Sequence, residues 1–495
     1  MGLAGSGGLV SADLAKKSAV GSGLVLPLAL AQFIASYAAT NMNVAISAIA
    51  TDLHTTVIGL QTTITLFTLT MASLMIPGSK VTDIWGRKFC FMLGLAVYGI
   101  GALLAAFAQG LGLMIFGYSA LEGIGSALLI PPVYILITVA FDDVKSRAKY
   151  FGVVSGAAGL GAAAGPLIGG LITSTISWRA SFILQVLVVG WILVMARRIA
   201  DPPRSGQRPA FDLEGAVLSA AGLFFVVLGI LLTNTYGWLA SRKDFKIAGT
   251  VIIGKGGVSP IWVFLAIGLI ILAWFYLHIS ARERQGKEPL LHRRLFHNHP
   301  ANLGLGTQLA QWLVMQGSFF VISVYLQQIW KYDAIKTGLV LTPATAGILF
   351  TSAIAGRLAR KRKQRSLIIA GFVLTLLGMA LILALVKENA GVVKFLPGLL
   401  LMGCGVGVML TASVNVVQSS FPDSDQGDIS GLSRSVSNLG SSFGTALVGS
   451  VLVAARLPEG KPFAVALAVL VGFALAGLGT AIAIPRRRHT EGAVP

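Results

Sequence analysis

A short basic segment near residue 83 decides the fold, because a related segment returns 277 residues later in the chain. The first copy reads Ser79-Lys80-Val81-Thr82-Asp83-Ile84-Trp85-Gly86-Arg87-Lys88, and the second reads Gly356-Arg357-Leu358-Ala359-Arg360-Lys361-Arg362-Lys363-Gln364-Arg365. Each copy is a basic turn between two long apolar stretches. Such a repeat indicates that the chain contains two related helical halves.

The composition of the 495 residues indicates a membrane protein. Hydrophobic residues make up 55% of the chain and charged residues 12%, against about 25% charged residues in ordinary soluble domains. Fourteen apolar stretches have the length of roughly 20 residues with which a helix crosses a bilayer. They centre near Ile34, Leu66, Gly99, Ile124, Gly161, Val189, Phe225, Ile270, Phe319, Phe350, Leu376, Val406, Phe443 and Leu470.

We therefore expect an all-α polytopic membrane protein with two six-helix bundles plus two extra linker helices, which makes 14 transmembrane helices. The expected parts are a cytoplasmic N-terminal tail (1–23), an N-terminal six-helix bundle (24–200), a linker with two extra transmembrane helices (201–300), a C-terminal six-helix bundle (301–485) and a cytoplasmic tail (486–495). The longest outer loop, 236–260, has no apolar stripe, so we expect it to be solvated.

The net charge of +19 would suit nucleic-acid binding, but the positions of the basic residues argue against it. Lys and Arg gather in alternate loops, to one of which Arg434 is assigned, and the positive-inside rule then places both termini in the cytoplasm. Basic inner loops face anionic lipid headgroups, so we expect membrane lipids and not nucleic acid as partners. The absence of an Asn-x-Ser/Thr sequon favours the inner or plasma membrane of a prokaryote.

Several motifs resemble those of the major facilitator superfamily, in particular its fourteen-span drug:proton antiporter branch of multidrug efflux type. The turn at Asp83, Gly86, Arg87 and Lys88 is similar to the cytoplasmic signature between the second and third helices of that superfamily. The fifth span is similar to the Gly-Pro signature of proton-coupled exporters, through Gly161, Gly165, Pro166, Gly169 and Gly170. Further similar residues are Trp178, Arg179, Phe182, Phe211, Asp212, Leu213, Gly215, Tyr325, Leu326, Gln327, Gly338, Leu339 and Pro343.

The resemblance implies a secondary active transporter, not an enzyme, that exports hydrophobic or amphipathic organic compounds such as drugs by proton antiport with alternating access. The partners would be a small-molecule amphipathic substrate and protons, with the proton gradient as energy source and no cofactor. The Asp83 turn would act as a cytoplasmic gating turn, and the glycines of the fifth span would let another helix approach closely. One chain encloses a complete pathway in this fold, so we expect a functional monomer.

Glu122 is the only one of the 19 acidic residues that the sequence places deep within a span. Ionisable residues inside a membrane are costly and are functional by default. Burial disfavours the charged form of a carboxyl group, so we expect Glu122 to load and release a proton and thereby couple transport to protons. The alternative is a permanently protonated glutamate that forms hydrogen bonds between helices.

The N-terminal bundle departs from the family at two charged positions. Ala38 stands where the family has an Asp in the first span, and Ser119 stands where it has an Arg in the fourth. These losses leave open a facilitator or symporter of lipids, metabolites or anions that lacks the standard proton coupling. A membrane-embedded enzyme or sensor is a remote alternative, because Glu122 has no second carboxylate or histidine beside it within a span.

Polar and aromatic residues of several spans are candidates for a substrate cavity at the midplane. The set is Tyr37, Thr40, Asn43, Tyr118, Ser119, Gln308, Gln311, Trp312, Asn415 and Gln418. Amides and aromatic rings suit amphipathic organic molecules, although hydrogen bonding between helices is the alternative for each residue. We expect no metal site, and interpret His292, His297 and His299 as flexible interfacial residues and Asp423, Asp425 and Asp428 as a solvated turn.

Overall fold

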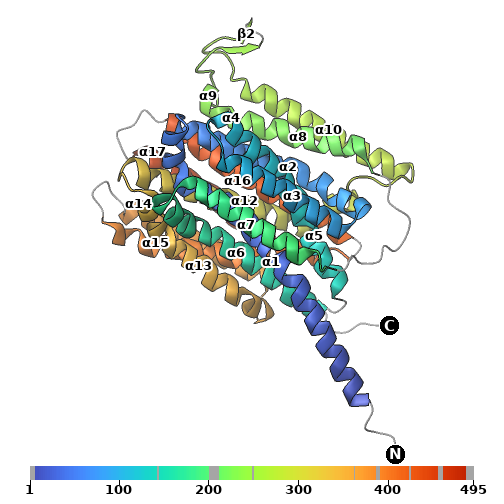
Figure 1. Ribbon diagram of the computed structural model, residues 1–495. Helices are drawn as coiled ribbons and strands as arrows, with labels where there is room; N and C mark the ends of the chain where they lie inside the picture. The colour runs from blue at the N-terminus through green and yellow to red at the C-terminus, as the bar shows by residue number, and fades with distance from the viewer. Residues whose placement is uncertain are drawn as a thin grey trace, which may run out of the picture.

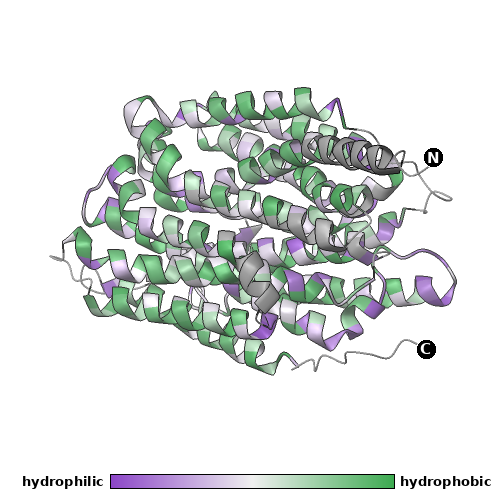
Figure 2. Cartoon of the chain, turned by 90° about the horizontal axis from the view of Figure 1, so that it is seen from below, coloured by the Kyte–Doolittle hydropathy of each residue, from purple (hydrophilic) through white to green (hydrophobic). Residues whose placement is uncertain are grey.

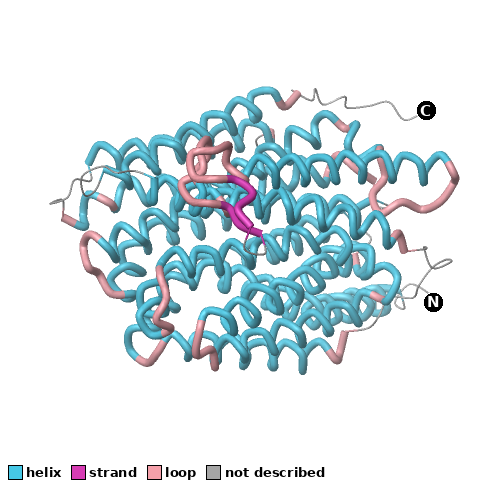
Figure 3. Tube along the Cα trace, turned by 90° about the horizontal axis from the view of Figure 1, so that it is seen from above, coloured by secondary structure: helices cyan, strands magenta, loops and turns pink. Residues whose placement is uncertain are grey.

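The computed structural model describes residues 6–141, 144–199, 211–247, 250–361, 363–385, 391–422, 425–454 and 461–485. Most of these residues are helical, and the strands form a single small hairpin in the described part of the chain (Figure 3). The helices lie side by side and form one broad bundle, from which the N-terminal part of the first helix projects (Figure 1).

The first six spans are formed by eight helical elements. Five spans are single helices: α1 (Ser6–Asp52), α2 (Val57–Trp85), α3 (Arg87–Ala106), α6 (Val144–Thr175) and α7 (Trp178–Ala196). The fourth span is composite and runs through α4 (Leu111–Met114), the π-helix η1 (Ile115–Glu122) and α5 (Gly123–Ala140). A π-helix inside a span widens one turn of the backbone and is frequent at functional sites.

The linker contains two long helices and the hairpin. Its elements are α8 (Leu213–Leu231), α9 (Thr233–Tyr236), β1 (Phe245–Ile247), β2 (Thr250–Ile253), α10 (Ile261–Arg284) and α11 (Arg294–His297). α8 and α10 pack against each other at one edge of the molecule, and the hairpin extends beyond them (Figure 1). The loop expected to be solvated thus contains an antiparallel pair of strands, in which Lys246 lies opposite Val251.

The C-terminal bundle repeats the six-span arrangement. Its elements are α12 (His299–Gln328), α13 (Ala334–Lys361), α14 (Gln364–Leu385), the 3-10 helix η2 (Val392–Lys394), α15 (Leu396–Gln418), α16 (Gln426–Ala454) and α17 (Lys461–Ala483). Apolar residues dominate the helices of both bundles (Figure 2).

Within the described residues, 13 helices are long and apolar enough to cross a membrane. The remaining expected span, near Phe443, corresponds to α16, which has 29 residues but is rich in serine. The all-α polytopic fold class is therefore confirmed. The expected C-terminal tail and the boundary near residue 200 lie outside the described residues.

The two bundles meet through α2 against α16 and through α6 against α13. Hydrogen bonds follow the α2–α16 contact along its length. Gln61 Nε2 donates to the Thr445 carbonyl at 3.0 Å, the Thr68 and Ser442 hydroxyls lie 2.5 Å apart, and Ser79 Oγ donates to the Gly427 carbonyl at 2.9 Å. We call the end of the molecule with Ser79 and residues 282–294 the basic end, and the end with β1 and β2 the hairpin end.

Candidate functional site

Glu122, the residue predicted to carry the proton, is the last residue of η1, and its side chain is completely buried. η1 lies very close to α3, because a Cβ added to Gly101 would be 2.7 Å from the Glu122 backbone nitrogen. The glycine thus brings α3 against the widened π-helical turn. This packing holds the Glu122 backbone in the interior of the N-terminal bundle.

The Glu122 carboxyl group has a sparsely polar environment. Neither of its oxygens has a hydrogen-bond partner of good geometry in the described part of the chain. The Tyr98 hydroxyl interacts with it electrostatically but donates to Gln185 Oε1 at 2.5 Å. No basic side chain forms an ion pair with Glu122 among the residues that the structure describes. A charge on this carboxylate would therefore be uncompensated in the observed arrangement.

The candidate cavity residues of the N-terminal bundle bond mostly within that bundle. The Tyr37 hydroxyl lies 2.6 Å from Ser181 Oγ, the Tyr118 hydroxyl donates to the Ala38 carbonyl at 3.2 Å, and Ser119 Oγ donates to the Thr63 carbonyl at 2.7 Å. Thr40 Oγ1 donates to backbone carbonyls of its own helix. The amide of Asn43 differs from these groups, because both of its polar atoms are buried without a partner among the described residues.

The candidates of the C-terminal bundle gather where α12, α15 and α16 meet. Ser433 Oγ donates to Gln308 Oε1 at 2.7 Å, and Ser413 Oγ donates to Gln311 Oε1 at 3.0 Å. Gln418 Nε2 donates to the hydroxyl of a third serine, Ser430, at a distance of 3.5 Å. Trp312 and Asn415 are half-buried on α12 and α15. The ten candidates therefore lie in two separate groups, one in each bundle.

The glycines of the fifth span lie against helices of both bundles. Gly161, Gly165 and Gly169 face Phe33, Thr40 and Asn41 of α1, where an added Cβ would overlap the neighbouring atoms. On the other side, Gly170 faces the Ala334 carbonyl of α13. The Pro166 carbonyl in turn meets Gly338 of α13. The small residues thus let α6 approach α1 and α13 at the same level.

The gating turn connects α2 with α3. Gly86 has φ 107°, a backbone conformation that suits glycine, and it ends α2 and begins α3. Lys88 Nζ donates to the Arg197 carbonyl at the end of α7, at 2.8 Å, where the helix dipole favours a cation. The Asp83 side chain lies outside the described residues. The contact between the bundles at this end is made one turn earlier, by Ser79 and Lys80.

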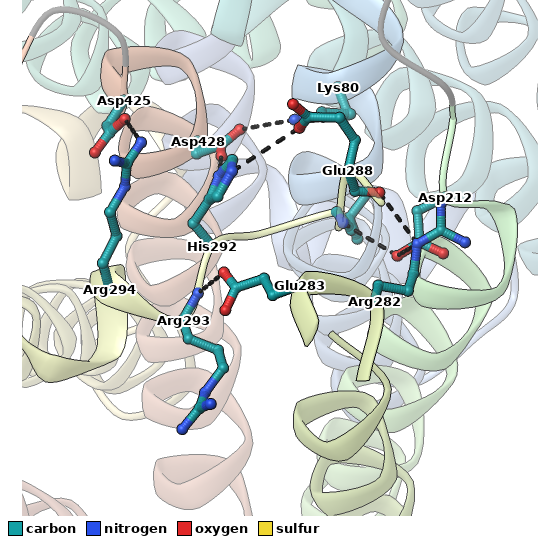
Figure 4. Close-up of polar contacts among 11 residues, drawn as sticks. Lys80, Asp212, Arg282, Glu283, Glu288, His292, Arg293, Arg294, Asp425 and Asp428 are labelled. Atoms are coloured by element: carbon teal, nitrogen blue, oxygen red, sulfur yellow. Dashed lines mark hydrogen bonds and ion pairs between the residues drawn. The ribbon is translucent and has the colours of Figure 1, made fainter. Parts of the chain in front are cut away.

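A cluster of ion pairs at the basic end joins both bundles to the linker (Figure 4). Lys80 Nζ of α2 lies 3.6 Å from Asp428 Oδ1 of α16, and Asp428 Oδ2 lies 3.1 Å from His292 Nδ1 of the linker. Arg294 of α11 pairs with the buried Asp425. We call Lys80, His292, Arg294, Asp425 and Asp428 the basic-end cluster.

The basic-end cluster corrects two of the expectations from sequence. His292 is not a free interfacial histidine, because its Nδ1 lies 3.1 Å from Asp428 Oδ2. This contact raises the pKa of His292, against the opposite effect of partial burial. Asp425 and Asp428 are not part of a solvated turn, since both are engaged in ion pairs. Asp423 lies outside the described residues, and His297 and His299 are exposed.

Asp212 connects the start of α8 with the end of α10. Its buried carboxylate accepts from the Gly215 amide at 3.0 Å and the Leu290 amide at 3.1 Å, and it lies 2.9 Å from His278 Nε2. Burial acts to raise the pKa of Asp212, but the Gly215 amide and His278 outweigh it and hold that pKa below its usual range. Asp212 thus caps α8 and fixes the linker helices to each other.

Arg434 is the most important residue that the sequence analysis misplaced. It was assigned to a cytoplasmic loop, but it lies inside α16, where its guanidinium group contacts Tyr134 of α5. A charge in a serine-rich stretch of low hydropathy resembles a loop, which explains the error. Its position eight residues after the start of α16 places it about 12 Å along the helix axis.

Comparisons with known protein families and sequences agree with the helical architecture described above. The family model described as Major Facilitator Superfamily matches residues 28–445, so the chain belongs to that superfamily and is a multi-pass membrane transporter. The chain is 29% identical over 433 residues to a puromycin resistance protein of Streptomyces alboniger, covering 87% of this chain and 81% of that protein. It is 28% identical over 439 residues to a cephamycin export protein of Amycolatopsis lactamdurans, covering 88% and 86%.

One solved structure supports the fold. A crystal structure of a human organic anion transporter matches with a TM-score of 0.60 at 12% identity, covering 93% of this chain and 99% of that chain. At this identity the match shows a shared fold and says nothing about the substrate of this chain. The predicted superfamily is therefore confirmed by the family model, the relatives and the architecture together.

Proposed function

We propose that this protein exports hydrophobic or amphipathic small molecules by proton antiport, with Glu122 as the proton carrier. Two findings support the export of drug-like compounds: membership of the superfamily, and similarity to proteins whose names describe puromycin resistance and cephamycin export. The observation that supports proton coupling is the completely buried Glu122 carboxyl group, which lacks both a counterion and a hydrogen bond of good geometry among the described residues.

The coupling follows from the environment of Glu122. An ionised carboxylate without a counterion is unfavourable in a low-dielectric interior, so loss of the proton requires water or a rearranged helix to reach Glu122. Proton release is then tied to the arrangement of the fourth span. The π-helical turn that ends at Glu122 supplies a place where the span can change its geometry without unfolding.

Alternating access would use the two contacts between the bundles. If the bundles rock about the α2–α16 and α6–α13 contacts, a central pathway opens to one side at a time. We propose that the basic end faces the cytoplasm, with both termini on that side of a prokaryotic plasma membrane, and that each monomer transports independently. Basic segments next to anionic lipid favour this orientation.

The test is energised accumulation of labelled amphiphiles in inside-out membrane vesicles. We expect wild-type vesicles to accumulate substrate and to lose it when a protonophore removes the gradient. Glu122→Gln should abolish the part of the substrate accumulation that the proton gradient drives. Glu214→Gln makes the same chemical change at an exposed side chain at the start of α8, so it should keep wild-type accumulation. Substrate entry that stops at equal concentrations on both sides and does not respond to the protonophore would favour an uncoupled facilitator.

A further inference from the structure

Arg434 lies where helices of both bundles meet. Successive residues of a helix point about 100° apart, and residues 433 to 435 of α16 contact three different helices. Ser433 Oγ donates to Gln308 of α12, the Arg434 guanidinium donates to Tyr134 of α5, and Ser435 Oγ donates to the Ala72 carbonyl of α2. The two serines fix the rotation of α16, so that Arg434 faces the fourth span across the boundary between the bundles.

The positive charge of Arg434 has no acidic partner within the described residues. Its guanidinium carbon lies 4.9 Å from the centre of the Tyr134 ring. No carboxylate forms an ion pair with it in the described part of the chain: Asp428, earlier on α16, pairs with Lys80 and His292. A cation inside a membrane span is costly unless it is paired. Among the residues that the structure describes, the positive charge of Arg434 between the bundles is therefore uncompensated.

The surroundings of Arg434 also supply hydrogen-bond donors. Asn438 lies one turn further along the same face of α16, and its Nδ2 has no partner among the described residues. The Nε2 of Gln308, whose Oε1 is held by Ser433, also lacks one. Arg434 and Asn438 are half-buried as whole residues, whereas the two unpartnered amide nitrogens are themselves buried, so a ligand would reach this group when the bundles move apart. A guanidinium group with amide donors nearby is a suitable site for a carboxylate.

We propose that Arg434, with the Asn438 amide, binds the anionic head of an amphipathic substrate, so that organic anions are preferred over neutral and cationic relatives of the same shape. The proposal rests on the proposed function, because it names the substrate class of the exporter. The hydrophobic body of the substrate would lie between the bundles, and its carboxylate would compensate the charge of Arg434. Tyr134 would orient the guanidinium group through its ring and hydroxyl.

The test compares three ligands that share one ring system: 1-naphthaleneacetate, 1-naphthaleneacetamide and 1-naphthylmethylamine. Their binding to the purified full chain in detergent is measured by calorimetry at pH 7.5, without a proton gradient. Because charge-assisted hydrogen bonds are strong, wild type should bind the acetate about tenfold tighter than the acetamide and the amine most weakly. Arg434→Gln should bind the acetate and the acetamide equally, and Arg434→Lys should keep part of the preference.

Arg242→Gln, at an exposed position near the hairpin end, is the matched control and should behave as wild type. The proposal is overturned if wild type shows no preference for the acetate or binds none of the three. It is also overturned if Arg434→Gln weakens all three ligands equally, since that result assigns Arg434 to bundle packing. If Arg434→Gln does not fold, the proposal is tested by two remaining results: the preference of wild type for the acetate, and the reduced preference expected of Arg434→Lys. Proton-driven export of neutral compounds without any preference would leave the proposed function standing.

Discussion

The Lys80 ammonium group lies 3.6 Å from the Asp428 carboxylate, with side chains that are 8% and 11% exposed, and this ion pair joins the two bundles at the basic end. The pair lies directly before the predicted gating turn, where Ser79 also donates to Gly427. The contact that closes this end is therefore formed by α2 and α16 themselves, and the basic-end cluster extends it to the linker.

Removal of this ion pair should open the basic end more often. Lys80→Gln should shift the equilibrium toward separation of the bundles by about 1 kcal/mol, which is roughly fivefold. The readout is the rate at which a thiol reagent labels Ile76→Cys, a buried position of α2, in a background in which Cys90 and Cys404 are replaced by serine. The exchange Lys80→Asp with Asp428→Lys should restore slow labelling. Unchanged labelling in Lys80→Gln would rule out a closing role for this pair.

Closure of the basic end should depend on pH through His292. The groups that face it are Asp428, Lys80, Glu288 and Arg294. Its raised pKa means that the stabilisation is fully present below the ordinary pKa of histidine, about 6.5, and is lost as the pH rises through the raised value. Acidification should therefore slow the labelling of Ile76→Cys more than it slows the labelling of a fully exposed cysteine, a comparison that corrects for the loss of the reactive thiolate. His292→Asn should remove this pH dependence. The control His299→Asn, at an exposed position, should keep the pH dependence. If the pH dependence persists in His292→Asn, it arises from another titratable group.

Asp212 should stabilise the linker helices strongly. Asp212→Ala removes the cap of α8 and leaves the Leu290 amide and His278 without their partner, so it should cost about 2–3 kcal/mol. Thermal unfolding in detergent, followed by size-exclusion chromatography, measures the loss. Glu214→Ala, two residues further on and 62% exposed at its side chain, serves as the control. Equal unfolding temperatures for the two variants would contradict the assigned role.

Close packing of α6 against α1 should be sensitive to a single methyl group. A Cβ on Gly161 would overlap the Phe33 carbonyl, whereas a Cβ on Gly156 in the same helix meets no atom within 4 Å. Gly161→Ala should therefore destabilise the protein by about 1–3 kcal/mol and reduce transport, and Gly156→Ala should do neither. The same unfolding and vesicle assays compare the two variants. A harmless Gly161→Ala would mean that α1 and α6 separate at little cost.

The sequence predicted the spans better than it predicted the contacts. Bilayer thickness fixes the length of an apolar helix, so thirteen spans are evident in the hydropathy, and even the serine-rich α16 was located near Phe443. Asp212 and Gly215 were noted only as residues similar to the family, and the structure shows that the Gly215 amide donates to the Asp212 carboxylate at the start of α8. In these cases the signal is local, because the physical cause lies within one helix or one turn.

The missed features depend on partners that are distant in sequence. Arg434 and Tyr134 are 300 residues apart, and His292 and Asp428 are 136 apart, so no periodicity reveals that they meet. The π-helix before Glu122 leaves no hydropathy signature either. Arg434 had no local clue, because the Ser, Asn and Gly residues that follow it are typical of a turn or loop.

The most direct test of the central claim is substrate-induced proton flux in proteoliposomes that contain wild type or Glu122→Gln, with labelled substrate exchange measured in the same preparations. We expect wild type to move protons when substrate is added. Glu122→Gln should keep substrate exchange, which needs no net proton movement, and lose the proton flux. Proton flux that persists at the wild-type rate in Glu122→Gln would contradict the assignment of Glu122 as the proton carrier.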